Sequence, residues 1–505
     1  MEKKHFPYLA YNWISAVGAV LALVSGSIIL FIFVAHLTIG ITKPYMGILI
    51  YLVLPVALIT GLFLIPAGMY LRWRAFQRKG ETPYIKWPSI DLNNKNQRNA
   101  ALLFILGTIM FVLISTVGTY HTYQYIDSVA FCGITCHRVM APEYTTYMNS
   151  PHARVKCVGC HIGPGAGLYA KSKVSGLYQV YATITGAYPR PIPIPIKDLR
   201  PVQEDCEQCH WPKQFFGSQK RLFAHYLYDK ANTFWGINML IKTGGDDPGT
   251  ASPSGIHWHT DPKVTVEYIA RDRKRQDIPW VRVTDKTTGK SVVYQDASDP
   301  LSKKERETAE TRIMDCIDCH NQPSHAFHSP DHEIDLAIFT GLIDRTIPEI
   351  KTVSVNAMAR VYKSDAEAFK GIADVMTDFY RTNYPDFLRQ RGTAIRNAVH
   401  ATQAAFGRNI FPDMKARWSD YPDNIGHFIS RGCMRCHDGN HKAENGSVIP
   451  NDCHTCHIIL SQGSGGLSNV IRENLKEGMD FSHPVDIEDA WQGGVCYECH
   501  EGVEP

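Results

Sequence analysis

The chain has 505 residues, of which 44% are hydrophobic, and its formal net charge is only +3 at pH 7. So small a basic surplus argues against binding to nucleic acid, and we expect no nucleic-acid partner. A chain of this length would ordinarily form about three domains.

Three apolar stretches near the N-terminus cover residues 13–37, 46–71 and 100–120, and none contains Asp, Glu, Lys or Arg. Each is long enough to cross the hydrocarbon core of a bilayer as a helix. The first is too long for a signal-peptide core and has no small-residue cleavage site, so it reads as an uncleaved anchor. We therefore predict that residues 1–120 form a three-helix membrane anchor in the lipid bilayer.

The basic residues around these stretches predict their orientation. Two lysines precede the first span and one lies between the first and second, whereas the loop between the second and third spans carries Arg72, Arg74, Arg78, Lys79, Lys86, Lys95 and Arg98. Because positive residues stay on the cytoplasmic side, the N-terminus is expected in the cytoplasm. Everything after residue 120 is then periplasmic, and the protein is placed in a bacterial inner membrane.

All 14 cysteines lie in that exported part, in seven pairs that are each followed at once by His. In a Cys-x-x-Cys-His motif the two thiols bind the vinyl groups of one haem, and the His binds its iron. Zinc ribbons and disulfides do not require that His. Six pairs have this spacing: Cys157/Cys160/His161, Cys206/Cys209/His210, Cys316/Cys319/His320, Cys433/Cys436/His437, Cys453/Cys456/His457 and Cys496/Cys499/His500.

The remaining pair, Cys132/Cys136/His137, has one additional residue between its cysteines. We expect it to hold a haem too, which makes seven covalently bound c-type haems. A single thioether bond, or no haem at this motif, is the alternative.

So many haems leave little chain for each one, and haem must replace much of the ordinary hydrophobic core. We therefore predict a mainly α, haem-built fold in which short helices and loops surround the haems. Residues 121–330 are expected to form a tetrahaem domain, and residues 331–505 a helical spacer followed by a trihaem domain. Residues 366–379 repeat apolar side chains at spacings of three and four, as in an amphipathic helix.

A small β-containing insert is predicted at about residues 211–315. There, residues 264–270, 280–284 and 291–294 are rich in β-branched and aromatic side chains, and a Thr-Gly turn signal lies between the last two. This pattern predicts an antiparallel hairpin or a three-stranded sheet. His257-Trp258-His259 alternates like a strand, so one of its two His is expected to bind a haem.

Twelve His beyond residue 121 and outside the motifs could supply the second axial ligands, which is enough for two His at each iron. Such ligation favours electron transfer, because no iron keeps an open position. Those close to haem motifs are the preferred candidates: His152, His325, His427 and His483.

Residues 131–161 carry a haem motif, then Met140, Tyr144 and Tyr147, then Ser150-Pro151-His152, and then a second motif. This segment resembles the NapC/NirT family of membrane-anchored quinol dehydrogenases. The resemblance implies that Met140 binds the first haem iron in place of the motif His. It also implies that His152 binds the iron held by His210, and that His325 binds the second haem.

The resemblance further implies a quinol site beside the first haem. The family has a Lys and then an Asp after the second motif; here Lys171 or Lys173 matches the Lys, but Gln179 stands where the Asp would be. A quinol needs a nearby proton acceptor, and His121 and Asp127 are the local alternatives. Three other departures are the spacing of the first motif, the place of Met140 three rather than two residues after His137, and the three spans, since the typical family anchor has one.

The expected function is that of a quinol:cytochrome c oxidoreductase. It would take electrons from menaquinol in the membrane quinone pool and pass them to periplasmic c-type cytochromes, in anaerobic or extracellular respiration. One alternative is a terminal reductase in which one open haem iron reduces a small substrate such as nitrite. Another is an electron-storing haem wire with no quinone chemistry.

Overall fold

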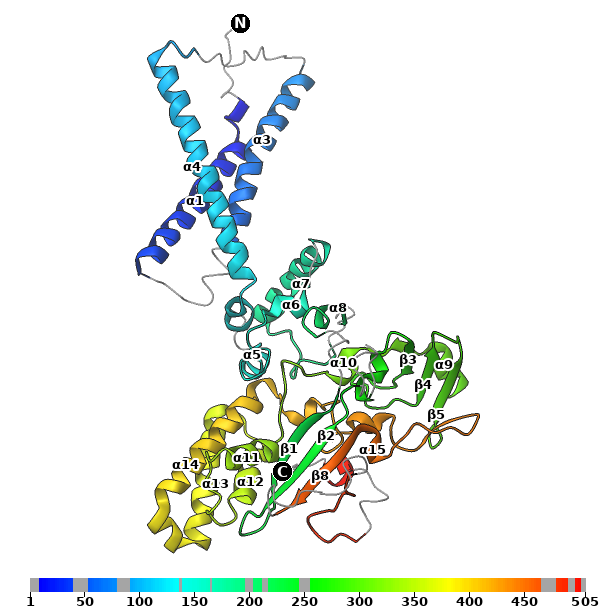
Figure 1. The fold of residues 1–505 in the computed structure, drawn as a ribbon. Coiled ribbons are helices and arrows are strands. Elements are labelled where there is room, and N and C mark those ends of the chain that lie inside the picture. Colours follow the sequence, from blue (N-terminus) through cyan, green and yellow to red (C-terminus); the bar gives the residue numbers. More distant parts are fainter. Residues whose placement is uncertain are drawn as a thin grey trace. The chain divides into compact units, whose positions relative to one another are not determined.

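The computed structural model describes residues 9–39, 53–79, 91–135, 139–163, 166–195, 203–210, 217–244, 255–464, 478–488 and 496–500 (Figure 1). Its contacts divide the chain into two compact units, Met1–Met140 and Ala141–Pro505. Each unit is described by itself.

The first unit contains three long helices, α1 (Trp13–Ile39), α3 (Leu54–Arg78) and α4 (Lys95–Ile126). All three are long and apolar enough to cross a membrane, so the prediction of three N-terminal membrane helices is confirmed. The third helix begins five residues earlier and ends six residues later than the predicted span 100–120. The first part of the predicted span 46–71, residues 46–52, lies outside the described residues.

Helices α1 and α3 pack closely through small residues. A Cβ atom on Gly18 would lie 2.7 Å from the carbonyl oxygen of Gly61, and one on Gly61 would lie 2.6 Å from the backbone nitrogen of Ala22. The hydroxyl of Ser15 also donates to the carbonyl of Ile65 at 2.9 Å. Close approach of backbones at small residues, with hydroxyls bonding across, is how helices associate in lipid.

Where the sequence predicted a helical spacer, the second unit has four helices, α11 (Pro330–Phe339), α12 (Ile350–Ala359), α13 (Asp365–Asn383) and α14 (Pro385–Asn409). Ser329 and Ser364 cap the first and third of these through side-chain acceptors, which satisfies otherwise unpaired amides. Their apolar faces form a core that includes the completely buried side chains of Ile334, Ile350, Ile372, Met376 and Phe406.

The predicted insert contains more sheet than the sequence indicated. The three predicted strands are present as β3 (Val264–Ile269), β4 (Trp280–Asp285) and β5 (Ser291–Asp296), but they belong to a five-stranded antiparallel sheet with the order β6-β3-β4-β5-β7. Its outer strands are β6 (Arg312–Ile313) and β7 (His441–Ala443). Val266, Tyr268, Ile278, Val281 and Ile449 form its core.

A second sheet has three antiparallel strands, β1 (Gln219–Tyr226), β2 (Phe234–Ile241) and β8 (His457–Gly463), side by side in that order (Figure 1). Both sheets therefore contain a strand from beyond residue 331. The boundary expected at residues 330/331 separates two groups of haem motifs along the chain, but the strands on either side of it hydrogen-bond to each other within one compact unit.

Candidate haem sites

We number the candidate haem sites from first to seventh by the order of their motifs. Five of the six regular motifs form a single helical turn at or within their cysteines: α6 (Cys157–His161), α10 (Cys316–Cys319), η8 (Gly432–Arg435), α15 (Cys453–Cys456) and α17 (Cys496–His500). At the third site, α8 (Gln203–Cys206) ends at the first cysteine. Because residues three apart share one face of a helix, such a turn directs both thiols to the same side.

Each motif His of these six sites faces a second His across a gap. The ring-centroid separations are 6.3 Å for His161–His325, 6.1 Å for His210–His152, 6.2 Å for His320–His257, 5.8 Å for His437–His259, 6.2 Å for His457–His427 and 6.2 Å for His500–His483. The six second His come from five different segments of the chain, and no two motifs share one.

These separations fit an iron ion between each pair of rings. A metal held at about 2 Å by one nitrogen of each imidazole places the two ring centroids roughly 6 Å apart. Rings in direct contact lie closer, as His328 and His332 do at 4.5 Å. The six pairs therefore have the dimensions of haem sites in which both axial positions are filled.

Hydrogen bonds orient most of the second His. The Nδ1 atoms of His152, His325, His257 and His483 lie 2.8, 2.8, 2.6 and 2.7 Å from the backbone carbonyl oxygens of Pro323, Glu143, Thr243 and Val485. A carbonyl accepts only from a protonated nitrogen, so Nε2 of each ring keeps its lone pair for a metal. The Nδ1 atoms of His427 and His457 are buried without a hydrogen-bond partner within the described part of the chain.

Burial also favours the neutral, metal-binding form of these rings. It lowers the pKa of His325 and His457 to about 4, although the carbonyl of Glu143 opposes it at His325. It lowers the pKa of His161, His320 and His500 as well. Each ring is therefore uncharged at neutral pH, as a metal ligand must be.

The thiols of successive sites lie close enough to influence one another. Cys206 of the third site shares a hydrogen bond with Cys316 of the fourth, which raises the pKa of Cys206. Burial raises the pKa of Cys319 to about 12, and Cys433 of the fifth site adds to the shift. A cysteine of a neighbouring site likewise contributes to the raised pKa of Cys160, Cys456 and Cys496; these neighbours are Cys209, Cys433 and Cys453, in that order. The second to seventh sites therefore follow one another in a row.

The sequence interpretation of His257 and His259 was wrong. They lie on a 3-10 helix, η5 (Gly255–Thr260), and not on a strand. On a strand, residues two apart point to the same face of the sheet. A 3-10 helix turns by about 120° per residue, so the side chains of residues two apart point in different directions. Both rings consequently face a motif His, His320 and His437, where the alternation predicted only one ligand.

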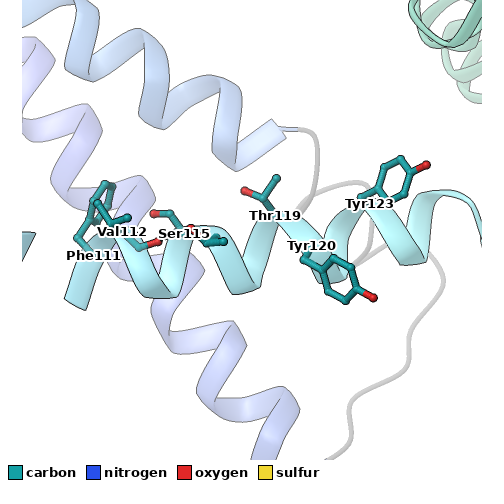
Figure 2. Close-up of a pocket in the computed structure, with 7 residues that line it drawn as sticks. Phe111, Val112, Ser115, Thr119, Tyr120 and Tyr123 are labelled. Carbon is teal, nitrogen blue, oxygen red and sulfur yellow. Dashed lines mark hydrogen bonds between the residues drawn. The ribbon is translucent and has the colours of Figure 1, made fainter. Parts of the chain in front are cut away.

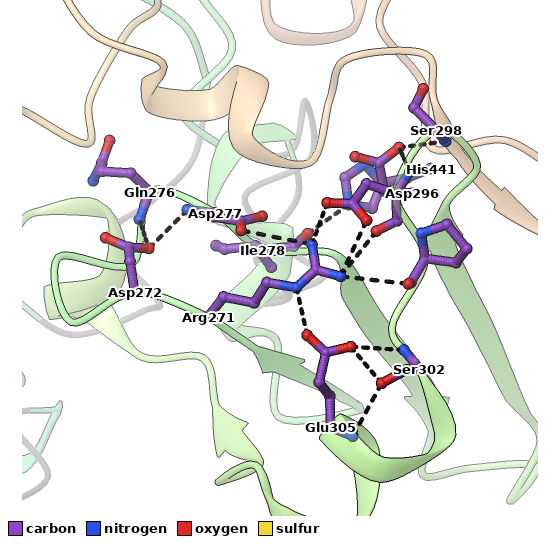
Figure 3. Close-up of polar contacts among 12 residues, drawn as sticks. Arg271, Asp272, Gln276, Asp277, Ile278, Asp296, Ser298, Ser302, Glu305 and His441 are labelled. Carbon is purple, nitrogen blue, oxygen red and sulfur yellow. Dashed lines mark hydrogen bonds and ion pairs between the residues drawn. The ribbon is translucent and has the colours of Figure 1, made fainter.

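The other six His that lie beyond residue 121 and outside the motifs face no motif His in this way among the described residues. His441 is almost completely buried and structural, with Nδ1 2.9 Å from Asp438 and Nε2 2.7 Å from the carbonyl of Ile278. Figure 3 shows it beside the polar cluster in which Arg271 binds Asp299 and Glu305. His225 pairs with Asp335, His328 stacks on His332, His454 is half-buried beside Asp452, and His400 is exposed.

The first site is only partly described. Cys132 lies in a short π-helix, η3 (Phe131–Thr135), and Met140 is half-buried at the end of the first unit, while Cys136 and His137 lie outside the described residues. Its ligands therefore stay predictions.

The predicted quinol-site residues lie on two helices. His121 is exposed on α4, and the buried Asp127 caps the end of that helix. Gln179 is exposed on α7 (Ala166–Thr185), which also carries Lys171 and Lys173, whose side chains lie outside the described residues. A shallow hollow follows the C-terminal half of α4, lined by Phe111, Val112, Ser115, Thr116, Thr119, Tyr120 and Tyr123 (Figure 2).

Comparison with known proteins agrees with this geometry. Residues 94–191 match the NapC/NirT cytochrome c family, N-terminal region, and the chain belongs to this family of membrane-anchored electron-transfer cytochromes. Over nearly its whole length it is similar to the cytochrome c-type protein ImcH of Geobacter sulfurreducens, with 44% identity over 496 residues that cover 97% of this chain and 95% of that protein. No solved structure matches the chain. It is accordingly an inner-membrane cytochrome that carries covalently bound c-type haem.

Proposed function

We propose that the protein is a quinol:cytochrome c oxidoreductase. It takes electrons from menaquinol and passes them along seven c-type haems to soluble periplasmic cytochromes, in anaerobic or extracellular respiration. The haems, when bound, supply the one-electron chemistry, and the chain supplies their attachment, ligation and spacing. The observation that carries this proposal is the set of six facing His pairs.

The His pairs favour electron transfer over reduction of a small substrate. A reductase needs an iron with an open position, but at the second to seventh sites the second His stands where a substrate would bind. The nitrite-reductase alternative would require one of these six imidazoles to leave its site, or an open iron at the first site.

Electrons are proposed to enter at the first site, where Met140 is the axial ligand implied by the family resemblance. A Met ligand raises the potential of a haem relative to its neighbours with two His. Gln179 has no ionisable group, so it cannot take a proton from quinol. Lys171, Lys173, His121 and Asp127 are the proposed acceptors, and the hollow on α4 offers apolar side chains and hydroxyls within the third span.

Electrons are proposed to leave at the C-terminal end, which is strongly acidic. Residues 438–505 contain twelve Asp and Glu but only three Lys and Arg, although the whole chain carries a net +3. Cys453, Cys496 and Cys499 of the last two sites are exposed there. A surface of one sign near the last haems would attract a soluble cytochrome of opposite charge and speed its encounter.

The purified protein in detergent tests this proposal. An alkaline pyridine assay should find seven haems per chain, and a menaquinol analogue should reduce them without a mediator. A haem that binds nitrite or cyanide in the untreated protein, together with nitrite consumption, would support the reductase instead. If dithionite reduced the haems but the quinol analogue did not, the result would support an electron-storing haem wire without quinone chemistry.

A further inference from the structure

The motif turns of the fourth and fifth sites are bonded directly to each other. Arg435 lies between the two cysteines of the fifth motif and is only 8% exposed. Its Nη2 donates at 2.8 Å to the carbonyl oxygen of Asp318, which lies between the two cysteines of the fourth motif. Its Nη1 and Nε donate to the carbonyls of Arg275 and Gly432 at 2.9 and 2.7 Å. One guanidinium therefore joins both attachment turns.

The turn of the fourth motif is also held by the bonds of the Asp318 side chain. The Asp318 side chain is 2% exposed, and its carboxylate accepts from the Tyr268 hydroxyl at 2.6 Å, from Arg275 at 2.6 Å and from Arg312 at 2.9 Å. Tyr268 belongs to β3, so these bonds attach the turn to the five-stranded sheet. Buried polar groups that are fully satisfied in this way hold a unique geometry.

The opposite sides of the same two sites are held by η5. His257 faces His320 of the fourth site, and His259 faces His437 of the fifth. The helix is itself fixed, because the Ile256 amide donates to the carbonyl of Lys242 at 2.8 Å and His257 Nδ1 lies 2.6 Å from the carbonyl of Thr243. A shift of one ligand would necessarily move the other.

The geometry points to a rigid junction between the fourth and fifth haem sites, in which Arg435 is the positioning residue and His257 and His259 are the paired ligands. This inference rests on the proposed function, in which electrons cross this junction from the first four haems to the last three. Each crossing moves one electron from one iron to the next and no proton. A fixed separation matters here because the chain between these two motifs is long and carries no haem motif of its own.

Replacing the two ligands tests the assignment without reference to activity. His259→Met and His257→Met should each convert one haem to Met ligation, seen as a Met-to-iron charge-transfer band and a higher potential of that haem. The double variant should convert two. His400→Met, an exposed His on α14, is the matched control and should change nothing. A double variant that gains only one Met-ligated haem, or none, would overturn the junction.

Arg435 is tested in the His259→Met background, where the increase of the charge-transfer band over the parent protein comes from the ferric fifth haem and is lost when that haem is reduced. Arg435→Gln should delay the loss of this added band after mixing with a menaquinol analogue, while the earlier absorbance change of the other haems keeps its rate. Arg435→Lys, which retains a donor, should restore part of the rate. An undelayed signal in Arg435→Gln would refute the positioning role. No reduction by quinol in the parent protein would instead refute the proposed function, and the ligand spectra would still stand.

Discussion

His325 faces His161 with a ring-centroid separation of 6.3 Å, and its other ring nitrogen lies 2.8 Å from the carbonyl oxygen of Glu143. His161 belongs to the second haem motif, whereas His325 lies five residues after the His of the fourth motif. The segment 316–325 therefore contains the fourth motif and also places a second His at the second site.

The first prediction follows from this pair. His325→Ala should leave haem attachment intact but open one axial position, so that one haem becomes high-spin and binds cyanide. Added imidazole should restore the low-spin spectrum. The measurement is the optical and EPR spectrum of the ferric protein.

His328→Ala is the control for this experiment, because His328 lies three residues further on and stacks on His332. It should leave every haem low-spin. If His325→Ala also left all haems low-spin, the pairing with His161 would be wrong.

The second prediction concerns Met140. Met140→His should lower the potential of one haem, because an imidazole replaces a thioether as ligand. A redox titration should show the highest-potential component moving down, and reduction by the menaquinol analogue should slow. Met148→His, an exposed Met on α5 (Ala141–Met148), should alter neither. Unchanged potentials in Met140→His would exclude Met140 as a ligand.

The third prediction concerns a buried ion-pair cluster. Lys351 is 2% exposed, and its ammonium lies 2.8 Å from Asp331 and 2.6 Å from Asp335. Lys351→Met leaves two buried carboxylates without their cation, which should cost about 3–5 kcal/mol of stability. Lys370→Met, which breaks an exposed pair with Asp374 on α13, should lower the denaturation midpoint little.

The cost of Lys351→Met should also depend on pH. Burial by itself raises the pKa of Asp331, but the Lys351 charge outweighs it, and the pKa lies below its usual 3.8. A carboxyl with a depressed pKa stabilises the fold above its unfolded pKa and loses that contribution as the pH falls through the folded value. The two proteins should therefore converge in denaturation midpoint on acidification. A difference that stayed constant down to the acid limit would contradict this account.

The fourth prediction concerns the acidic C-terminal region. Reduction of a positively charged cytochrome by the protein should slow as salt is added, because the Debye length shortens to about 10 Å at 0.1 M ionic strength. The double charge reversal Asp480→Lys with Glu498→Lys should slow it further at low salt. Asp374→Lys is the matched reversal on α13. A rate that is independent of salt, or that rises with salt, would rule out exit through this surface.

The amino-acid sequence by itself determined the covalent part of the haem sites. Both thiols and the motif His lie within five or six consecutive residues, so their spacing is visible without a fold. The three membrane helices were equally predictable, because a span in lipid must be long, apolar and helical whatever surrounds it. The strands β3, β4 and β5 followed from local β-branched patterns.

The family resemblance implied the partners of His161 and His210, but the tertiary structure alone decided what lies opposite the other four motif His. His257 reaches His320, and His259 reaches His437, across long stretches of chain, and no local pattern records such a distance. The same holds for two strands. β7 is short and β8 begins at a haem motif, and each is stabilised by pairing with a strand far away in the sequence. Alternation suggested a strand at residues 257–259, but a 3-10 turn directs the two rings to different sites. Attachment is local chemistry, whereas the second ligand depends on how distant segments pack.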